Sequence, residues 1–198
     1  MKALIAFKIS ESQQIHIAIN EQDKINTYGY ETNGLHIFDE VDAEYVHDGK
    51  AIILISDSAR YVVETLCASL EMALKNELPL DASLAVGKVG CFFSKKKYMT
   101  ADESDESEKK DDIFSQYWVW SSSKNIQTWL YNVNNKIYLE ISPTYPWLFS
   151  DPQEDEHYIS FDEYMNDYRS ITLVELQESL VRSWITECHV LLQTMETV

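Results

Sequence analysis

Side chains that favour β-structure recur at every second position in residues 126–130 and again in residues 137–141. Alternation with a period of two is typical of strands that bury one face. The pair Asn134-Asn135 lies between the two runs, and asparagine tolerates the positive φ that a tight hairpin turn requires. The sequence therefore predicts an antiparallel hairpin here, which commits this part of the chain to a sheet.

The N-terminal segment shows the same pattern. Apolar residues alternate within residues 3–9 and within residues 15–19, and the polar stretch Ser10–Gln13 separates them as a turn. Asp48-Gly49 is a further hairpin signal. The wholly apolar residues 51–55 predict a central strand that is covered on both faces.

A long helix is predicted after these strands. Ser56–Ser58 offers N-cap side chains, an apolar stripe at four-residue spacing continues to about Asn76, and Pro79 lies just beyond it. Residues 86–94 then return to a strand pattern.

Helices are also expected in the C-terminal third. Ser160–Glu163 fits a capping box, and Thr172–Glu175 repeats the pattern. A core-facing stripe at four-residue spacing follows the second box, comprising Leu176, Leu180, Trp184, Cys188 and Leu192.

These elements, taken in order, predict an α+β fold with an antiparallel or mixed β-sheet, one long central helix and a C-terminal helix pair. A chain of 198 residues is long enough to bury a sizeable core, so we expect one domain over residues 1–198. The highly charged residues 101–112 are expected to form a mobile acidic loop within it.

The charge balance excludes one broad class of function. The chain has 33 acidic and 16 basic residues, a net charge of −17. Nucleic-acid binding through a basic surface is therefore excluded, and docking on an anionic membrane is disfavoured. A basic protein is the partner that such a chain would attract.

Most of the negative charge is concentrated in two segments. Residues 102–112 contribute a net −5 and residues 151–167 a net −7. A solvated loop and helix-start acids explain part of this concentration, and a partner-binding face is the alternative. The predicted partner-binding residues are Asp151, Glu154, Asp155 and Glu156, followed by Asp102, Glu103, Asp105, Glu106, Asp111 and Asp112.

No motif for a catalytic site, a phosphate loop or a metal site is present, and no cofactor is expected. Asp151, Asp155 and His157 could touch one metal ion, but a solvated acidic loop explains them better. A pair such as Cys67 with His189 stays open, although Cys67 lies close to an apolar helix stripe and is expected to be a packing residue.

Aromatic residues gather in one part of the sequence. They are Trp118, Trp120, Trp129, Tyr131, Tyr145 and Trp147. Cross-strand pairing in the core is the plainer explanation, and an aromatic patch that anchors a partner is the alternative.

A cytoplasmic location is expected. The stretch Met1–Ser10 is interrupted by Lys8 and lacks a secretory cleavage pattern, and no run approaches the roughly 20 apolar residues of a membrane span. The odd number of cysteines, three, fits reduced thiols.

The C-terminal half resembles a known family. The resemblance rests on Trp129-Leu130-Tyr131, Lys136–Ile141, Pro143–Trp147, Tyr158–Tyr164 and Asn166-Asp167-Tyr168. These segments resemble immunity proteins of contact-dependent growth inhibition and related polymorphic toxin systems. The resemblance implies a cytoplasmic antidote that binds one cognate toxin domain and blocks its action.

The leading hypothesis is therefore a non-enzymatic immunity protein, monomeric when free, that forms an equimolar complex with a basic toxin, for which a nuclease is the expected class. One alternative is a small cytosolic enzyme that uses His36, His157 or Cys67 in a pocket. Another is an acidic nucleic-acid mimic that inhibits a DNA-binding protein.

Overall fold

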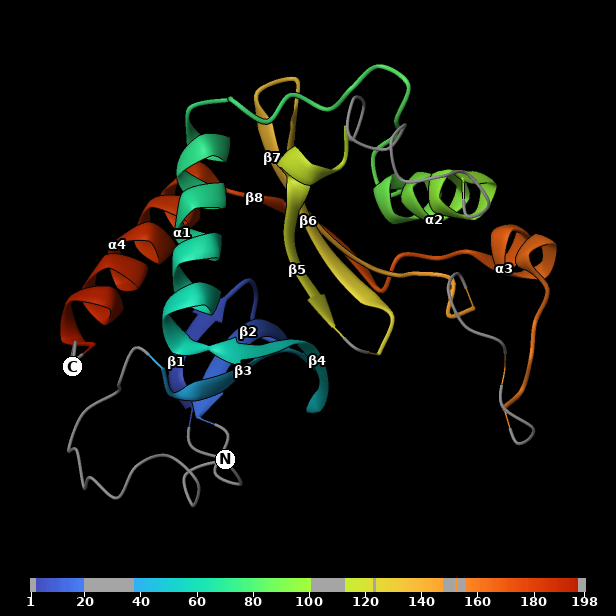
Figure 1. The fold of residues 1–198 in the computed structure, drawn as a ribbon. Helices are drawn as coiled ribbons and strands as arrows, with labels where there is room; N and C mark the ends of the chain where they lie inside the picture. Colours follow the sequence, from blue (N-terminus) through green and yellow to red (C-terminus); the bar gives the residue numbers. More distant parts are fainter. Residues whose placement is uncertain are drawn as a thin grey trace.

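The computed structural model describes residues 3–19, 38–100, 113–122, 124–147, 152 and 156–195. Within these residues the chain forms two four-stranded antiparallel sheets and four α-helices (Figure 1). The predicted α+β class is confirmed, and the sheets are antiparallel.

The first sheet is a meander in which each strand pairs with the next one along the chain. Its strands are β1 (Ala3–Lys8), β2 (Gln13–Ile19), β3 (Glu40–His47) and β4 (Lys50–Ser58). The predicted hairpin of β1 and β2 is confirmed. Asp48 and Gly49 have φ values of 49° and 76° and form the predicted turn between β3 and β4.

Strand β4 lies at the edge of its sheet, so the prediction of a central strand over residues 51–55 was wrong. A β-bulge explains why apolar residues follow one another here. The register shifts between Ala43 and Glu44, so that Leu54 has no directly paired residue while its neighbours Ile53 and Ile55 do. Leu54 and Ile55 are both buried, and β4 contacts strands of the second sheet.

The second sheet is a meander as well. Its strands are β5 (Trp118–Ser122), which follows the short 3₁₀ turn η2 (Ser115–Tyr117), β6 (Ile126–Val133), β7 (Lys136–Pro143) and β8 (Thr172–Leu176). Asn134 and Asn135 have φ values of 51° and 61°, and the predicted β6–β7 hairpin is confirmed.

One predicted helix start was wrong. Thr172–Glu175 fits a capping box in sequence, yet these residues belong to β8, which pairs with Ile137–Ile141 of β7. The last helix begins after it, at Glu178, with Gln177 as its N-cap. Long-range pairing therefore overrides the local helix signal, because alternate residues of this segment are buried on the sheet.

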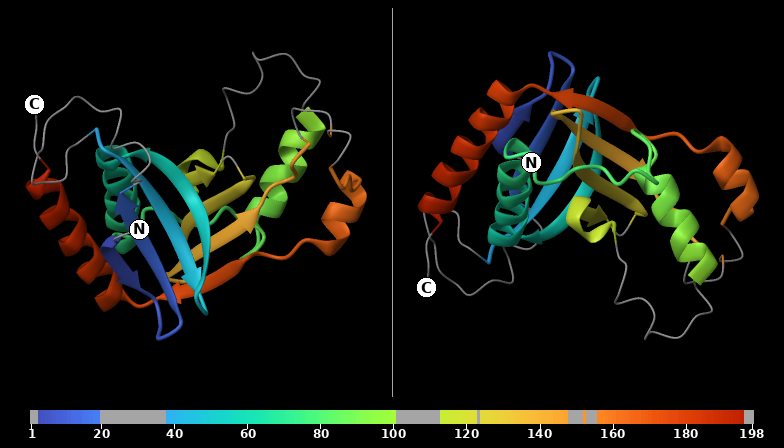
Figure 2. Two further views of the ribbon diagram at one scale, coloured as in Figure 1. Left: turned by 90° about the horizontal axis from the view of Figure 1, so that it is seen from below. Right: turned by 90° about the horizontal axis from the view of Figure 1, so that it is seen from above.

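The helices lie in two pairs at opposite ends of the molecule (Figures 1 and 2). Helices α1 (Ala59–Leu74) and α4 (Glu178–Thr194) pack side by side at one end. Helices α2 (Val89–Thr100) and α3 (Phe161–Asp167) lie at the other end. The long central helix is confirmed as α1. The two C-terminal helices exist, but β8 separates them and they do not form a packed pair.

The capping box at the start of α3 is confirmed. The Ser160 hydroxyl accepts a hydrogen bond from the Glu163 amide, and the Glu163 carboxylate accepts one from the Ser160 amide. The strand predicted at residues 86–94 was wrong, because α2 starts at Val89.

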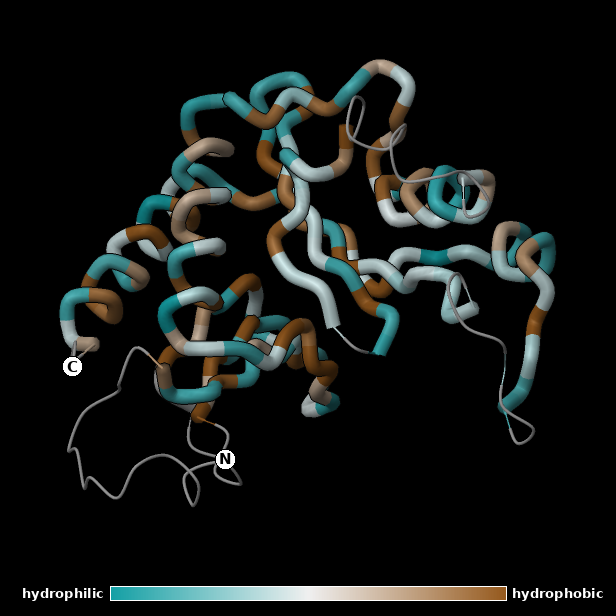
Figure 3. The backbone as a smooth tube through the Cα atoms, in the orientation of Figure 1, coloured by the Kyte–Doolittle hydropathy of each residue, from teal (hydrophilic) through white to brown (hydrophobic). Residues whose placement is uncertain are grey.

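The core lies between the sheets and the α1–α4 pair. Buried side chains of both sheets, α1 and α4 form one contiguous cluster, with Trp120, Trp129 and Trp184 among its largest members. Hydrophobic and hydrophilic residues alternate along α1 and α4 (Figure 3), as expected for helices that bury one face. Among the described residues, no helix is long and apolar enough to cross a membrane.

Candidate functional site

Four aromatic side chains from three segments meet where α2 and α3 face one another. We call Tyr98, Trp147, Tyr158 and Phe161 the aromatic surface. Tyr98 stacks on Phe161 with ring centroids 3.9 Å apart, and Trp147 lies 5.1 Å from Tyr158. Tyr158 is 53% exposed and Tyr98 48% exposed. Exposed Trp and Tyr side chains held in fixed positions are the commonest anchors of protein–protein interfaces.

A buried tyrosine supports this surface from below. Tyr145 is 3% exposed, and its ring contacts Tyr98, Trp147 and Phe161. Its hydroxyl donates a hydrogen bond to the Ile159 carbonyl at 3.1 Å. Tyr145 belongs to a small cluster of buried aromatic side chains that is separate from the main core. The α2–α3 end of the molecule is therefore held together by a second, smaller hydrophobic cluster.

The aromatic surface is bordered by acidic residues. Glu156 is exposed and accepts a hydrogen bond from Trp147 Nε1 at 3.1 Å. Asp162 and Glu163 lie in the first turn of α3, next to Phe161, and both are exposed. Hydrogen bonds from Ser160 hold the pKa of Glu163 below its usual value. This border is therefore negatively charged at neutral pH.

Lysines of α2 lie on another side of that helix. Lys96 Nζ lies over the Phe114 ring and Lys97 Nζ over the Phe93 ring, at 5.9 and 6.0 Å from the ring centroids. Phe93 and Phe114 belong to the main core, whereas Tyr98 contacts α3. The positive charge of these two lysines is thus directed toward the main core and away from α3.

Of the ten predicted partner-binding residues, Glu156 is the one that the structure describes. The remaining nine lie outside the described residues, and they are Asp102, Glu103, Asp105, Glu106, Asp111, Asp112, Asp151, Glu154 and Asp155. The loop predicted at residues 101–112 lies outside them too.

The residues that flank residues 101–112, and those that flank residues 148–155 at the start of the second acidic segment, are nevertheless described. Three of these four residues lie at or near the aromatic surface, and the fourth, Ile113, packs against the main core. Residues 101–112 follow Thr100, two residues after Tyr98 in the last turn of α2. Residues 148–155 are bounded by Trp147 and Glu156, which are hydrogen-bonded to each other. The start of residues 101–112 and both ends of residues 148–155 therefore lie near the aromatic surface.

A buried carboxylate holds α2 in place. Glu140 on β7 is fully buried, and each of its carboxylate oxygens accepts one backbone N–H and one tyrosine hydroxyl. Oε1 accepts from Gly90 N and Tyr168 Oη at 3.3 Å each, and Oε2 accepts from Val89 N at 3.3 Å and Tyr131 Oη at 2.8 Å. The carboxylate thus supplies acceptors to the N-terminal amides of α2, which otherwise lack them. This contact explains why residues 89–94 are helical despite their strand-like sequence.

Burial raises the pKa of Glu140, although the four donors oppose that shift. Burial and the nearby Glu140 charge also raise the pKa of Tyr131 and of Tyr168 above their usual range. A carboxylate that is enclosed by protein and fully hydrogen-bonded has no free acceptor for a substrate proton. The Glu140 cluster therefore positions α2 and the segment after α3.

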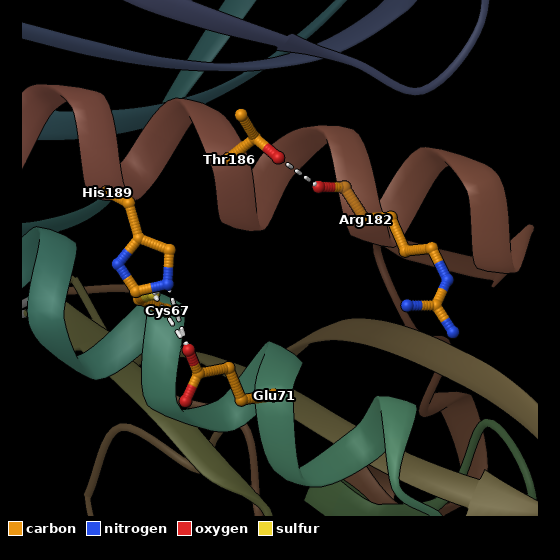
Figure 4. Close-up of polar contacts among 5 residues, drawn as sticks. All are labelled: Cys67, Glu71, Arg182, Thr186 and His189. Atoms are coloured by element: carbon orange, nitrogen blue, oxygen red, sulfur yellow. Dashed lines mark hydrogen bonds and ion pairs between the residues drawn. The ribbon is translucent and has the colours of Figure 1, made fainter.

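A second polar cluster lies at the other end of the molecule, between α1 and α4 (Figure 4). His189 Nε2 on α4 lies 3.0 Å from Glu71 Oε1 and 3.9 Å from Cys67 Sγ, and Cys67 Sγ lies 4.0 Å from Glu71 Oε1. The structure brings together the pair Cys67 and His189, which the sequence left open. Glu71, four residues after Cys67 on α1, is a partner that sequence reasoning missed.

This cluster lacks the features of an activated cysteine nucleophile. The same nitrogen of His189 faces both the thiol and the carboxylate, whereas a catalytic relay uses one imidazole nitrogen for each. Burial and the Glu71 charge also raise the pKa of the Cys67 thiol, which disfavours the thiolate that a nucleophile needs. His157 is exposed near α3, and His36 lies outside the described residues. The enzyme alternative thus gains no support from this cluster.

Comparisons with known proteins give one structural likeness. No protein-family model matches the chain, and no curated protein sequence matches it. The crystal structure of CdiI from Burkholderia dolosa AUO158 is similar over 87% of this chain and 94% of that chain, with 11% sequence identity and a TM-score of 0.45. A likeness of this extent is too low to transfer a function.

Proposed function

We propose that this protein is a non-catalytic immunity protein that binds a basic toxin domain through the aromatic surface and the two acidic segments attached to it. The observation that carries the proposal is that residues 101–112 begin two residues after Tyr98 and residues 148–155 are bounded by Trp147 and Glu156, so that both segments start near the aromatic surface. The sequence resemblance of the C-terminal half to immunity proteins supports it.

The proposed chemistry combines anchoring with charge. Trp147 and Tyr158 would supply apolar contact area, because aromatic side chains contribute most of the binding energy in many interfaces. The acids Asp151, Glu154, Asp155 and Glu156, with the acids of residues 102–112, would pair with Lys and Arg of the toxin. Opposite charges raise the association rate and exclude partners of the wrong sign. An acidic surface fits the phosphate-binding cleft of a nuclease, and the complex would form in the cytoplasm with one copy of each chain.

The test uses the protein encoded by the gene next to that of this chain, expressed as its C-terminal domain. We expect a stable complex and protection of growing cells from that domain. Replacing Asp151, Glu154, Asp155 and Glu156 together by Lys should reduce affinity at least tenfold at low salt and less at high salt, because salt screens charge pairs. The matched control replaces by Lys four exposed acids that lie far from the aromatic surface, namely Glu11, Asp57, Glu64 and Glu178. It makes the same change in net charge and should reduce affinity less.

Two results would contradict the proposal. One is unchanged affinity and protection with the four-lysine variant, which would remove the acids from the interface. The other is a neighbouring protein that neither binds this chain nor harms cells.

A further inference from the structure

The cluster of Cys67, Glu71 and His189 places three ligand atoms around one point. The atoms are Sγ and Oε1 on α1 and Nε2 on α4, and His189 is 118 residues from Glu71 and 122 from Cys67 in sequence. The three atoms form a triangle with sides of 3.0, 3.9 and 4.0 Å. The point that is equally far from all three atoms lies about 2.1 Å from each of them. Zinc bonds to nitrogen and oxygen are about 2.0–2.2 Å long and those to sulfur about 2.3 Å.

The chemical types of the three groups agree with this geometry. Imidazole, carboxylate and thiolate are all lone-pair donors, and together they form a set that suits a borderline-soft divalent cation. An ordinary ion pair of His189 with Glu71 explains the 3.0 Å contact. Cys67, which belongs to the main core, adds a thiol within 4.0 Å of both ligand atoms. A triad of nucleophile, base and orienting acid was excluded above, because one nitrogen faces both partners.

Access and surrounding charge favour a cation. The side chains of His189 and Glu71 are 52% and 41% exposed, so an ion can enter from solvent and keep a water molecule as a further ligand. The buried Cys188 is close enough to Cys67 for the two thiols to interact, and Glu187 adds negative charge nearby. Burial beside Glu71 raises the pKa of the Cys67 thiol, and a bound cation would reverse that effect by favouring the thiolate.

We infer that Cys67, Glu71 and His189 form a binding site for a divalent transition-metal cation of the Zn²⁺ type. The site joins α1 to α4, so that an occupied site stabilises the folded chain by mass action. It lies at the opposite end of the molecule from the aromatic surface (Figures 1 and 2), and it does not depend on the proposed function.

The experiment titrates the full-length, EDTA-treated and reduced protein with Co²⁺, and in parallel with Zn²⁺. We expect one Co²⁺ per chain with a near-ultraviolet absorption band from the bond between thiolate and cobalt, displaced by Zn²⁺. Zn²⁺ should also raise the Tm. Cys67→Ser should remove the absorption band, and Glu71→Gln and His189→Gln should each weaken binding at least tenfold.

The controls are Cys91→Ser and His157→Gln, which change a thiol and an imidazole away from the cluster and should leave binding unaltered. Because Glu71 and His189 are partly exposed, their variants should fold even if Cys67→Ser does not. The inference is overturned if wild-type protein binds less than one Co²⁺ without the thiolate band, or if Glu71→Gln and His189→Gln bind as tightly as the controls.

Discussion

The ring of Tyr98, in the last turn of α2, lies face to face on the ring of Phe161, the first residue of α3, with 3.9 Å between centroids and 4° between planes. This contact joins two helices that are separated by 60 residues of chain and by most of the second sheet. It also holds the last turn of α2, after which residues 101–112 begin.

Phe161→Ala should loosen the α2–α3 end and leave the main core intact. Phe161 is half-buried among Tyr98, Tyr145 and Tyr164. We expect a loss of about 1–2 kcal/mol in the free energy of unfolding, below the value for a fully buried Phe. Hydrogen exchange should quicken in α2 and α3 and stay slow in α1. Met99→Ala is the control, because Met99 is 69% exposed, and it should change stability by less than about 0.5 kcal/mol.

Glu140→Gln should destabilise the protein. Each carboxylate oxygen accepts one backbone N–H, Oε1 from Gly90 and Oε2 from Val89. In glutamine an NH₂ group replaces one of these oxygens, so whichever way the side chain is turned, one of the two backbone amides loses its acceptor. An unsatisfied buried donor costs about 1–3 kcal/mol. Urea denaturation measures the difference. The control Glu175→Gln changes an exposed carboxylate on β8 and should have a much smaller effect. Equal losses for both variants would show that Glu140 does not hold α2 in place.

Gly90→Ala should be much more harmful than Gly49→Ala. A Cβ at position 90 would overlap Ser142 Oγ and lie 2.9 Å from Ser142 Cβ, so α2 would have to move away from β7. We expect a loss of about 2–4 kcal/mol. Position 49 has open space but a φ of 76°, so alanine there should cost about 1 kcal/mol. The Tm of the two variants, measured by thermal denaturation, compares the cost of a steric clash at position 90 with the cost of a positive φ at position 49.

Glu163 should contribute a pH-dependent part of the stability. Its pKa is below the ordinary value of 4.5 in the folded protein, because the Ser160 hydroxyl and amide donate to the carboxylate. The unfolded state therefore binds more protons, and the contribution is present above pH 4.5 and lost as the pH falls below it. The difference in unfolding free energy between wild type and Glu163→Gln should shrink between pH 5 and pH 3. A difference that grows as the pH falls would contradict this assignment.

The thiols Cys67 and Cys188 should react slowly in the native protein. Both are buried, and desolvation raises the pKa of each. In metal-free protein at pH 8, iodoacetamide should label them at least tenfold more slowly than after unfolding in guanidinium, as read by mass spectrometry. Labelling of Cys67 faster than a free cysteine would instead favour the enzyme alternative.

Local signals predicted the elements that depend on local chemistry. The turns at Asp48-Gly49 and Asn134-Asn135 formed as expected, because those residues accept positive φ. The capping box at Ser160–Glu163 formed as well. The sequence failed where a distant partner decides the structure: α2 depends on the Glu140 carboxylate, and β8 depends on pairing with β7.

The candidate sites show the same division. Glu156 and its neighbours were predicted as partner-binding residues from the concentration of acidic side chains, which the sequence shows directly. Glu71 could have been found from its i, i+4 spacing to Cys67, but no local pattern links either residue to His189. Only the packing of α1 against α4 brings the three side chains together.

Helix α2 is held at both ends, by the close approach of Gly90 to Ser142 at its start and by the ring of Phe161 near its finish. Its outward positions, such as Lys95 and Met99, carry no comparable constraint. If the protein binds a toxin as proposed, substitutions at those positions would change the surface beside Tyr98 without disturbing the contacts that hold the helix. Helix α2 is then a practical place to engineer a new binding specificity.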